Sequence, residues 1–217
     1  MNNYLAAVLQ SIKPMYCFMI AYGIKAPVPV PNSYKRYEVR KTMPKVSTPF
    51  KTYVYCSKHD GDGCIPAGTP LQWLGKVVFE YVCDEIQTIY ADDFNYGYYY
   101  ISDDDLKLTG LSREELWEYG KGQTLYLWHI SDLVIYDEPK ELSEFRSIDK
   151  KMQKECQFRF RYYVNPELCN CANLPAGFAC SRWVQTEFCR PYEIEKCECL
   201  KSLTRPPQSW CYVKEAV

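Results

Sequence analysis

The charged residues best suited to recognise an anion or a heterocycle lie in one short alternating segment, residues 33–41. In an extended strand, Arg36, Glu38 and Arg40 fall on one face, while Lys35 and Tyr37 fall on the other. The first face then places a carboxylate between two guanidinium groups. Two interpretations follow: a solvated strand with paired charges, or the polar floor of a cleft in which Glu38 orients an arginine toward a ligand.

The length of the chain bounds its organisation. At 217 residues it suits one domain of moderate size, or one domain that carries an insertion. Its 20 tyrosines are a high number, and tyrosine favours strands, interfaces and stacking on bases. The composition therefore indicates a β-rich globular protein without selecting a function.

Charge is distributed unevenly along the chain, although the formal net charge is only −1. Residues 35–58 carry seven basic side chains against Glu38 alone, and residues 84–105 carry seven acidic side chains and no basic one. This asymmetry predicts either a positive cleft on a nearly neutral protein or two neighbouring patches that neutralise each other.

We expect a cytoplasmic location without a membrane partner, because the sequence shows no recognisable secretory signal. The apolar run near the N-terminus is short, lacks a basic leader and is interrupted by Lys13 and Pro14. No stretch reaches the roughly 20 apolar residues that a membrane-spanning helix needs. The twelve cysteines are then thiols or metal ligands.

The pattern of elements predicts an α+β fold with more strands than helices. We expect strands at residues 4–9, 52–56, 74–83 and 124–136, and a long loop at 91–105. One helix is expected to begin at Pro14, capped by Ser11, and to end at Gly23. A second begins after Ser112, where Glu115 completes a capping box. This arrangement favours a small, strongly bent β-barrel with flanking helices.

A cysteine-rich insertion is predicted at residues 150–204, which hold seven of the twelve cysteines. Two close pairs stand out, Cys169 with Cys171 and Cys197 with Cys199. Two such pairs can supply the four thiolates of a structural zinc site. Unligated thiols and disulfides are the alternatives. Catalytic zinc is not expected, because no histidine accompanies the pairs.

Five motifs in order resemble the ASCH domain of the PUA-like superfamily. They are LQSIKP at residues 9–14, Lys35-x-x-Glu38-x-Arg40, GKVVFE at 75–80, the segment 139–145, and PPQSWCY at 206–212. The resemblance implies a domain at residues 1–149 that is completed by residues 205–217 after the insertion. Ser33 stands where the family places glycine, and a proline-rich loop lengthens the junction before it.

The resemblance implies a cleft beside the first helix that binds RNA or a nucleotide. Its ligand-binding residues would be Lys13, Lys35, Glu38 and Arg40, with an aromatic side chain, Tyr37 or Tyr34, available to stack on a base. Some bacterial relatives hydrolyse the acetyl amide of N4-acetylcytidine with a lysine, a threonine and a glutamate.

Only the lysine of that hydrolase set is matched here, by Lys35. Glu38 occupies the threonine position, and the glutamate position falls near Thr109, with Asp105 as the nearest acid. We therefore expect binding without catalysis. The alternatives are an amidohydrolase acting through Lys35 and Glu38 on an acylated nucleoside, and an adaptor that binds a protein partner through its insertion.

Overall fold

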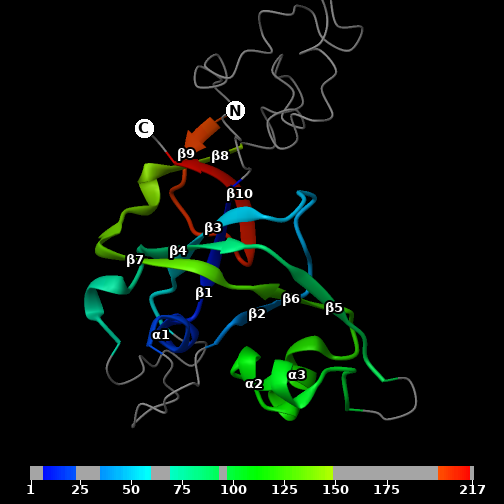
Figure 1. The fold of residues 1–217 in the computed structure, drawn as a ribbon. Helices are drawn as coiled ribbons and strands as arrows, with labels where there is room; N and C mark the ends of the chain where they lie inside the picture. Colours follow the sequence, from blue (N-terminus) through cyan, green and yellow to red (C-terminus); the bar gives the residue numbers. More distant parts are fainter. Residues whose placement is uncertain (1–6, 23–34, 60–68, 93–96, 149–199, 216–217) are drawn as a thin grey trace, which may run out of the picture.

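The computed structural model describes residues 7–22, 35–59, 69–92, 97–148 and 200–215, and it confirms the α+β class (Figure 1). The strands in these ranges are β1 (Ala7–Ile12), β2 (Tyr37–Arg40), β3 (Phe50–Cys56), β4 (Val77–Cys83), β5 (Ile86–Ile89), β6 (Leu125–His129), β7 (Ser131–Lys140), β8 (Phe145–Ile148), β9 (Leu200–Ser202) and β10 (Trp210–Glu215). The helices are α1 (Pro14–Tyr22), α2 (Asp103–Thr109) and α3 (Arg113–Gly120), with short 3-10 turns η1 (Leu71–Trp73) and η2 (Leu142–Glu144).

The described strands form two sheets. The larger sheet has the order β7-β4-β3-β1-β10-β8-β9, in which β1 runs parallel to β3 and antiparallel to β10. The smaller sheet has the order β2-β6-β5. In these ranges the hydrogen-bonded ladders do not close into a single ring. Strand β9 lies inside the range predicted as an insertion and pairs with β8, so the sheet includes part of that range.

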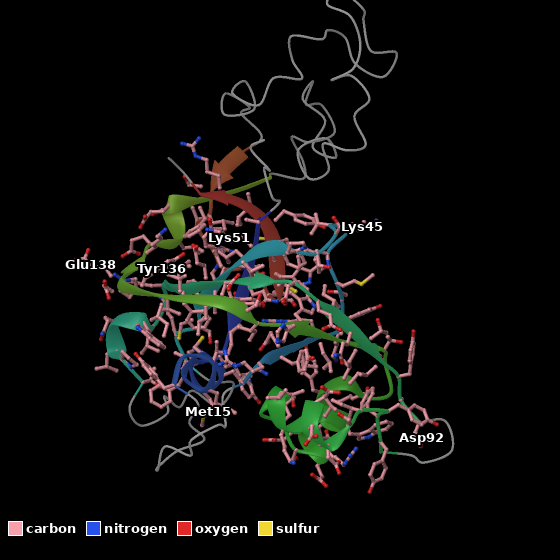
Figure 2. The ribbon with its side chains drawn as sticks, in the orientation of Figure 1. Met15, Lys45, Lys51, Asp92, Tyr136 and Glu138 are labelled. Atoms are coloured by element: carbon pink, nitrogen blue, oxygen red, sulfur yellow. The ribbon has the colours of Figure 1, made fainter. Side chains whose placement is uncertain are left out.

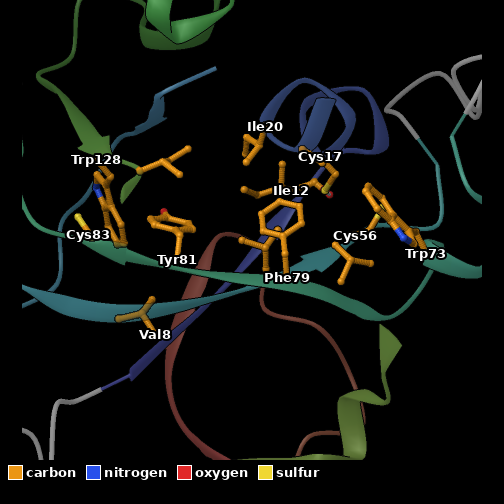
Figure 3. Close-up of a cluster of buried hydrophobic side chains, with 14 of the residues drawn as sticks. Val8, Ile12, Cys17, Ile20, Cys56, Trp73, Phe79, Tyr81, Cys83 and Trp128 are labelled. Atoms are coloured by element: carbon orange, nitrogen blue, oxygen red, sulfur yellow. The ribbon is translucent and has the colours of Figure 1, made fainter. Parts of the chain in front are cut away.

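The main core lies between the two sheets and is closed by α1 (Figure 3). Alternate residues of each strand supply it because successive strand side chains point to opposite faces. Val8 comes from β1, Phe79 and Tyr81 from β4, Trp128 from β6 and Cys17 from α1. A separate cluster packs the other face of the small sheet against α2 and α3.

Helix α1 begins at Pro14, as predicted, but Ser11 does not cap it. Ser11 lies within β1, and its hydroxyl donates to the Pro207 carbonyl at 2.7 Å. The predicted capping box of α3 is confirmed, since Ser112 and Glu115 bond each other's backbone N–H. The predicted strand at 124–136 is two strands. They are β6 in the small sheet and β7 in the large sheet, and Asp132 within β7 takes a left-handed φ of 46°.

Helix α2 corrects the end of the loop predicted at residues 91–105, because the helix begins at Asp103. The Ser102 hydroxyl accepts from the Asp105 N–H, and aspartates occupy the first turn, where they favour a helix N-terminus. Gly110, with φ of 68°, ends the helix in a left-handed conformation. The same region also contains an isolated bridge between Ala91 and Tyr99.

Candidate functional site

A cleft of about 530 Å³ lies beside α1, where the end of β1, strand β2, helix α3 and the segment before β10 meet. Figure 1 shows α1, β2 and α3 gathered around this part of the molecule. The cleft is lined by Ser11, Ile12, Lys13, Tyr16, Lys35, Glu38, Val39, Arg40, Leu111, Glu115, Glu118, Tyr119, Gln208 and Ser209. Four of the five predicted ligand-binding residues are in this set: Lys13, Lys35, Glu38 and Arg40.

A buried row of alternating charges forms the floor of the cleft. Glu38 lies between two cations, with its Oε1 3.1 Å from Arg40 Nη2 and its Oε2 3.3 Å from Lys35 Nζ. None of the three side chains is more than 8% exposed. Both cations also bond to backbone carbonyls, Lys35 to Thr109 at 2.6 Å and Arg40 to Ser11 at 2.9 Å. These bonds to two separate segments hold the three charges in place.

The side chain of Lys35 can contact that of Glu38 because Lys35 lies before the start of β2. The prediction that they lie on opposite strand faces was wrong, since β2 begins only at Tyr37. The Lys35 N–H donates to the Met19 carbonyl at 3.3 Å, which ties this stretch to α1. The alternation of β2 therefore applies to Glu38 and Arg40 and leaves Lys35 able to reach them.

Tyr37 lies apart from the cleft and does not line it. It belongs to the cluster under α2 and α3, its hydroxyl accepts from Gln87 Nε2 at 2.9 Å, and its ring lies 5.3 Å from that of His129. The aromatic side chains that line the cleft are Tyr16 and Tyr119.

Sequence reasoning missed the roles of Tyr16 and Tyr119, although each had a positional signal. Tyr16 follows Lys13 by three residues at the start of α1, and Tyr119 lies in the last turn of the helix that the capping box predicted. Lys35 Nζ lies 5.2 Å from the centroid of the Tyr16 ring, and Lys41 Nζ lies 5.1 Å from that of Tyr119.

The lining of the cleft is mixed in charge, which corrects the expectation of a basic cleft. It contains three basic side chains, Lys13, Lys35 and Arg40. It also contains three acidic ones, Glu38, Glu115 and Glu118. Such a lining offers hydrogen-bond donors and acceptors together, which suits the edge of a heterocycle better than an isolated phosphate.

The protonation of Lys35 is set by opposing influences. Burial lowers the pKa of Lys35, the Glu38 carboxylate acts to raise it, and Arg40 adds to the lowering. The short bond from Nζ to the Thr109 carbonyl requires a proton on Nζ, whichever form the amine takes. The position of Nζ therefore suits a hydrogen-bond donor. Because its pKa is lowered, Lys35 loses its proton at a lower pH than an ordinary lysine does.

The position of the hydrolase glutamate carries no carboxylate. Thr109 is buried, and its hydroxyl donates to the Leu106 carbonyl at 2.6 Å. Asp105 accepts from the Ser102 hydroxyl at the start of α2 and does not line the cleft. Apart from Glu38, the described carboxylates that line the cleft are those of Glu115 and Glu118 in α3. Glu115 Oε2 accepts a hydrogen bond from the Ser112 N–H.

The predicted zinc ligands Cys169, Cys171, Cys197 and Cys199 lie outside the described residues. Within the described ranges, no three histidine, cysteine or acidic side chains gather in a way that could hold a metal ion. None of the helices in these ranges is both long enough and apolar enough to cross a bilayer.

Comparison with known proteins gave similarity only among solved structures. No protein-family model and no curated protein sequence matches this chain. The crystal structure of ASCH from Zymomonas mobilis is similar at 14% identity, over 69% of this chain and 78% of that one, with a TM-score of 0.37. A single-residue variant of the same protein is similar at 13% identity, over 69% and 80%, with a TM-score of 0.36.

Proposed function

We propose that the cleft binds RNA or a modified nucleotide and does not hydrolyse it. The observation that supports this most is the buried Lys35–Glu38–Arg40 row at the floor of a cleft of about 530 Å³. Clefts of roughly 300–1,000 Å³ with a few fixed polar groups are typical of small-molecule sites. The motif resemblance to ASCH domains points to the same ligand class.

Each part of the lining has a role in this proposal. The Glu38 carboxylate accepts from the amino group of a base, while Lys35 and Arg40 donate to its carbonyl groups. The rings of Tyr16 and Tyr119 provide apolar faces for stacking. Lys13 is exposed at the rim, where its charge can meet a phosphate without a desolvation cost.

A second candidate function is hydrolysis of an acylated nucleoside such as N4-acetylcytidine. The lowered pKa of Lys35 favours it, because a neutral amine can act as a base or nucleophile. The residue pattern opposes it, since Glu38 stands at the threonine position and Thr109 near the glutamate position. An adaptor role through residues 150–204 and a cytoplasmic location are also proposals, and both rest on the sequence.

Incubation with N4-acetylcytidine separates binding from hydrolysis. Chromatography should show the nucleoside intact, while calorimetry with the same compound and with ribonucleoside monophosphates should show binding. Lys13→Ala should weaken monophosphate binding about tenfold. Lys45→Ala, an exposed lysine that does not line the cleft, should change it little. Release of cytidine that is abolished in Lys35→Ala would instead establish the hydrolase.

A further inference from the structure

A tyrosine-bearing hairpin continues from the end of β5, far from the cleft. In Figure 2, Asp92 of this hairpin is well separated from Met15 of α1. The Asp92 N–H donates to the Tyr98 carbonyl and the Tyr100 N–H donates to the Tyr90 carbonyl, each at 2.9 Å. These bonds flank the bridge between Ala91 and Tyr99 and fix the register of the two arms.

This register places three tyrosines and one aspartate on a single face. Cross-strand neighbours share a face, and adjacent residues of a strand alternate between faces. Ala91 and Tyr99 face inward, and Tyr99 is only 4% exposed. The outward face therefore carries Tyr90, Asp92, Tyr98 and Tyr100, which we call the tyrosine platform.

The rings of the tyrosine platform are open to solvent. Tyr90 and Tyr100 are each 59% exposed, and Tyr98 is 45% exposed. Three large exposed rings share one backbone ladder, and contiguous exposed apolar area marks interaction sites. Tyrosine is also a preferred contact residue, because it offers a large amphipathic surface and has few rotatable bonds.

The charges around the tyrosine platform select a cationic partner. Asp92 lies within the array and accepts from the Tyr100 hydroxyl at 3.0 Å. Of the other described acids in residues 84–105, Asp84 pairs with His129, Asp103 with Arg113 and Asp104 with Lys107. The Asp92 carboxylate is therefore the charge within the platform itself, and it attracts cations and repels the phosphates of a nucleic acid.

We propose that the tyrosine platform docks an arginine-bearing segment of a partner protein. A guanidinium is planar, so it can stack on a tyrosine ring and bond to a neighbouring carboxylate at the same time. Lysine carries the same charge but lacks that plane, so the platform should prefer arginine. This surface is separate from the cleft and does not depend on the ligand of the cleft.

The test uses fluorescence anisotropy of a labelled peptide of alternating arginine and glycine, titrated with the full chain. We expect saturable binding that weakens with salt and is stronger than for the matched lysine peptide. The double variant Tyr90→Ser, Tyr100→Ser should bind at least about tenfold more weakly. Tyr90→Phe, Tyr100→Phe keeps the rings and should retain binding. Leu71→Ser, at an exposed apolar residue elsewhere, should have no effect.

Three results would overturn the proposal. The first is no binding of the arginine peptide, or equal binding by the serine double variant. The second is binding of a single-stranded RNA oligonucleotide that the serine double variant loses, since the occupant would then be a nucleic acid. The third is concentration-dependent dimerisation in sedimentation that the same variant abolishes, which would assign the platform to a second copy of the chain.

Discussion

At the scale of single residues, the cleft depends on Glu38, because each of its carboxylate oxygens faces a buried cation. Lys35 and Arg40 would repel each other without it, and each is almost fully removed from water. Both cations also bond to backbone carbonyls, so neither can swing out to solvent without losing a further hydrogen bond. Removing the central charge should therefore cost more than removing an exposed pair.

Glu38→Gln should lower the free energy of unfolding by about 3 kcal/mol, because it leaves two buried cations without their counter-charge. Urea unfolding followed by circular dichroism measures this loss. Glu80→Gln is the matched control, since Glu80 pairs with a Lys51 side chain that is 40% exposed, and it should cost about 1 kcal/mol or less. Equal losses in the two variants would contradict a buried charge row.

Stability should fall at alkaline pH partly because of Cys83. Burial raises the pKa of the Cys83 thiol to about 12, above its ordinary value of 9.0. The unfolded chain therefore ionises first, and the stabilisation present below pH 9 is lost by about 1.4 kcal/mol per pH unit as the pH rises toward 12. Urea unfolding between pH 8 and 10.5 should show a shallower decline in Cys83→Ala. If the free energy of unfolding falls equally with pH in the parent protein and in Cys83→Ala, this thiol does not contribute to the pH dependence of stability.

At the scale of elements, the sequence predicted the parts with local signals and missed those set by contacts. Pro14 and the Ser112 capping box located the starts of α1 and α3, and the strand-forming residues of 52–56 and the apolar run within 74–83 located β3 and β4. The four cleft residues Lys13, Lys35, Glu38 and Arg40 came from the motif resemblance. Here they converge because β2 brings Glu38 and Arg40 beside the end of β1.

Two local predictions failed for different reasons. Helix α2 had local signals, a serine cap and an acidic first turn, but the tyrosines before it suggested a continuous loop. Tyr37 was expected to stack on a ligand, yet its side chain is recruited to the core under α2 and α3. No spacing rule predicts which face of β2 the helices will cover.

Ser112→Ala should destabilise the protein by about 1 kcal/mol, because it removes the hydroxyl that accepts from the Glu115 N–H at the start of α3. Thermal and urea unfolding measure the change. Ser143→Ala, at an exposed serine in η2, should stay within about 0.5 kcal/mol of the parent protein. An effect of Ser112→Ala as small as that of the control would mean that the cap contributes little to the fold.

At the scale of the whole molecule, the basic run at residues 35–58 is dispersed and forms no single patch. Lys35 and Arg40 line the cleft, Lys41 lies over the Tyr119 ring, and Lys51 pairs with Glu80 on the large sheet. The acidic run is also divided, because Asp92 lies within the tyrosine platform while Asp84, Asp103 and Asp104 pair with His129, Arg113 and Lys107. Neither run therefore forms a single patch in the described residues.

The prediction that residues 150–204 bind zinc rests on the spacing of their cysteines. We expect about one zinc ion per chain in protein purified without oxygen, held by Cys169, Cys171, Cys197 and Cys199. Metal analysis by mass spectrometry measures it, and Cys197→Ser should remove the zinc while Cys211→Ser, in β10, should retain it. Zinc well below one ion per chain would favour unligated thiols.

The proposed ligand occupies the cleft over Lys35, Glu38 and Arg40. Nuclear magnetic resonance of nitrogen-15-labelled protein, titrated with ribonucleoside monophosphates and with N4-acetylcytidine, locates the binding site residue by residue. We expect saturable shifts in the backbone amides of Lys13, Leu111, Tyr119 and Ser209, which weaken together in Lys13→Ala. Shifts confined to residues outside the cleft, or none at millimolar ligand, would contradict it.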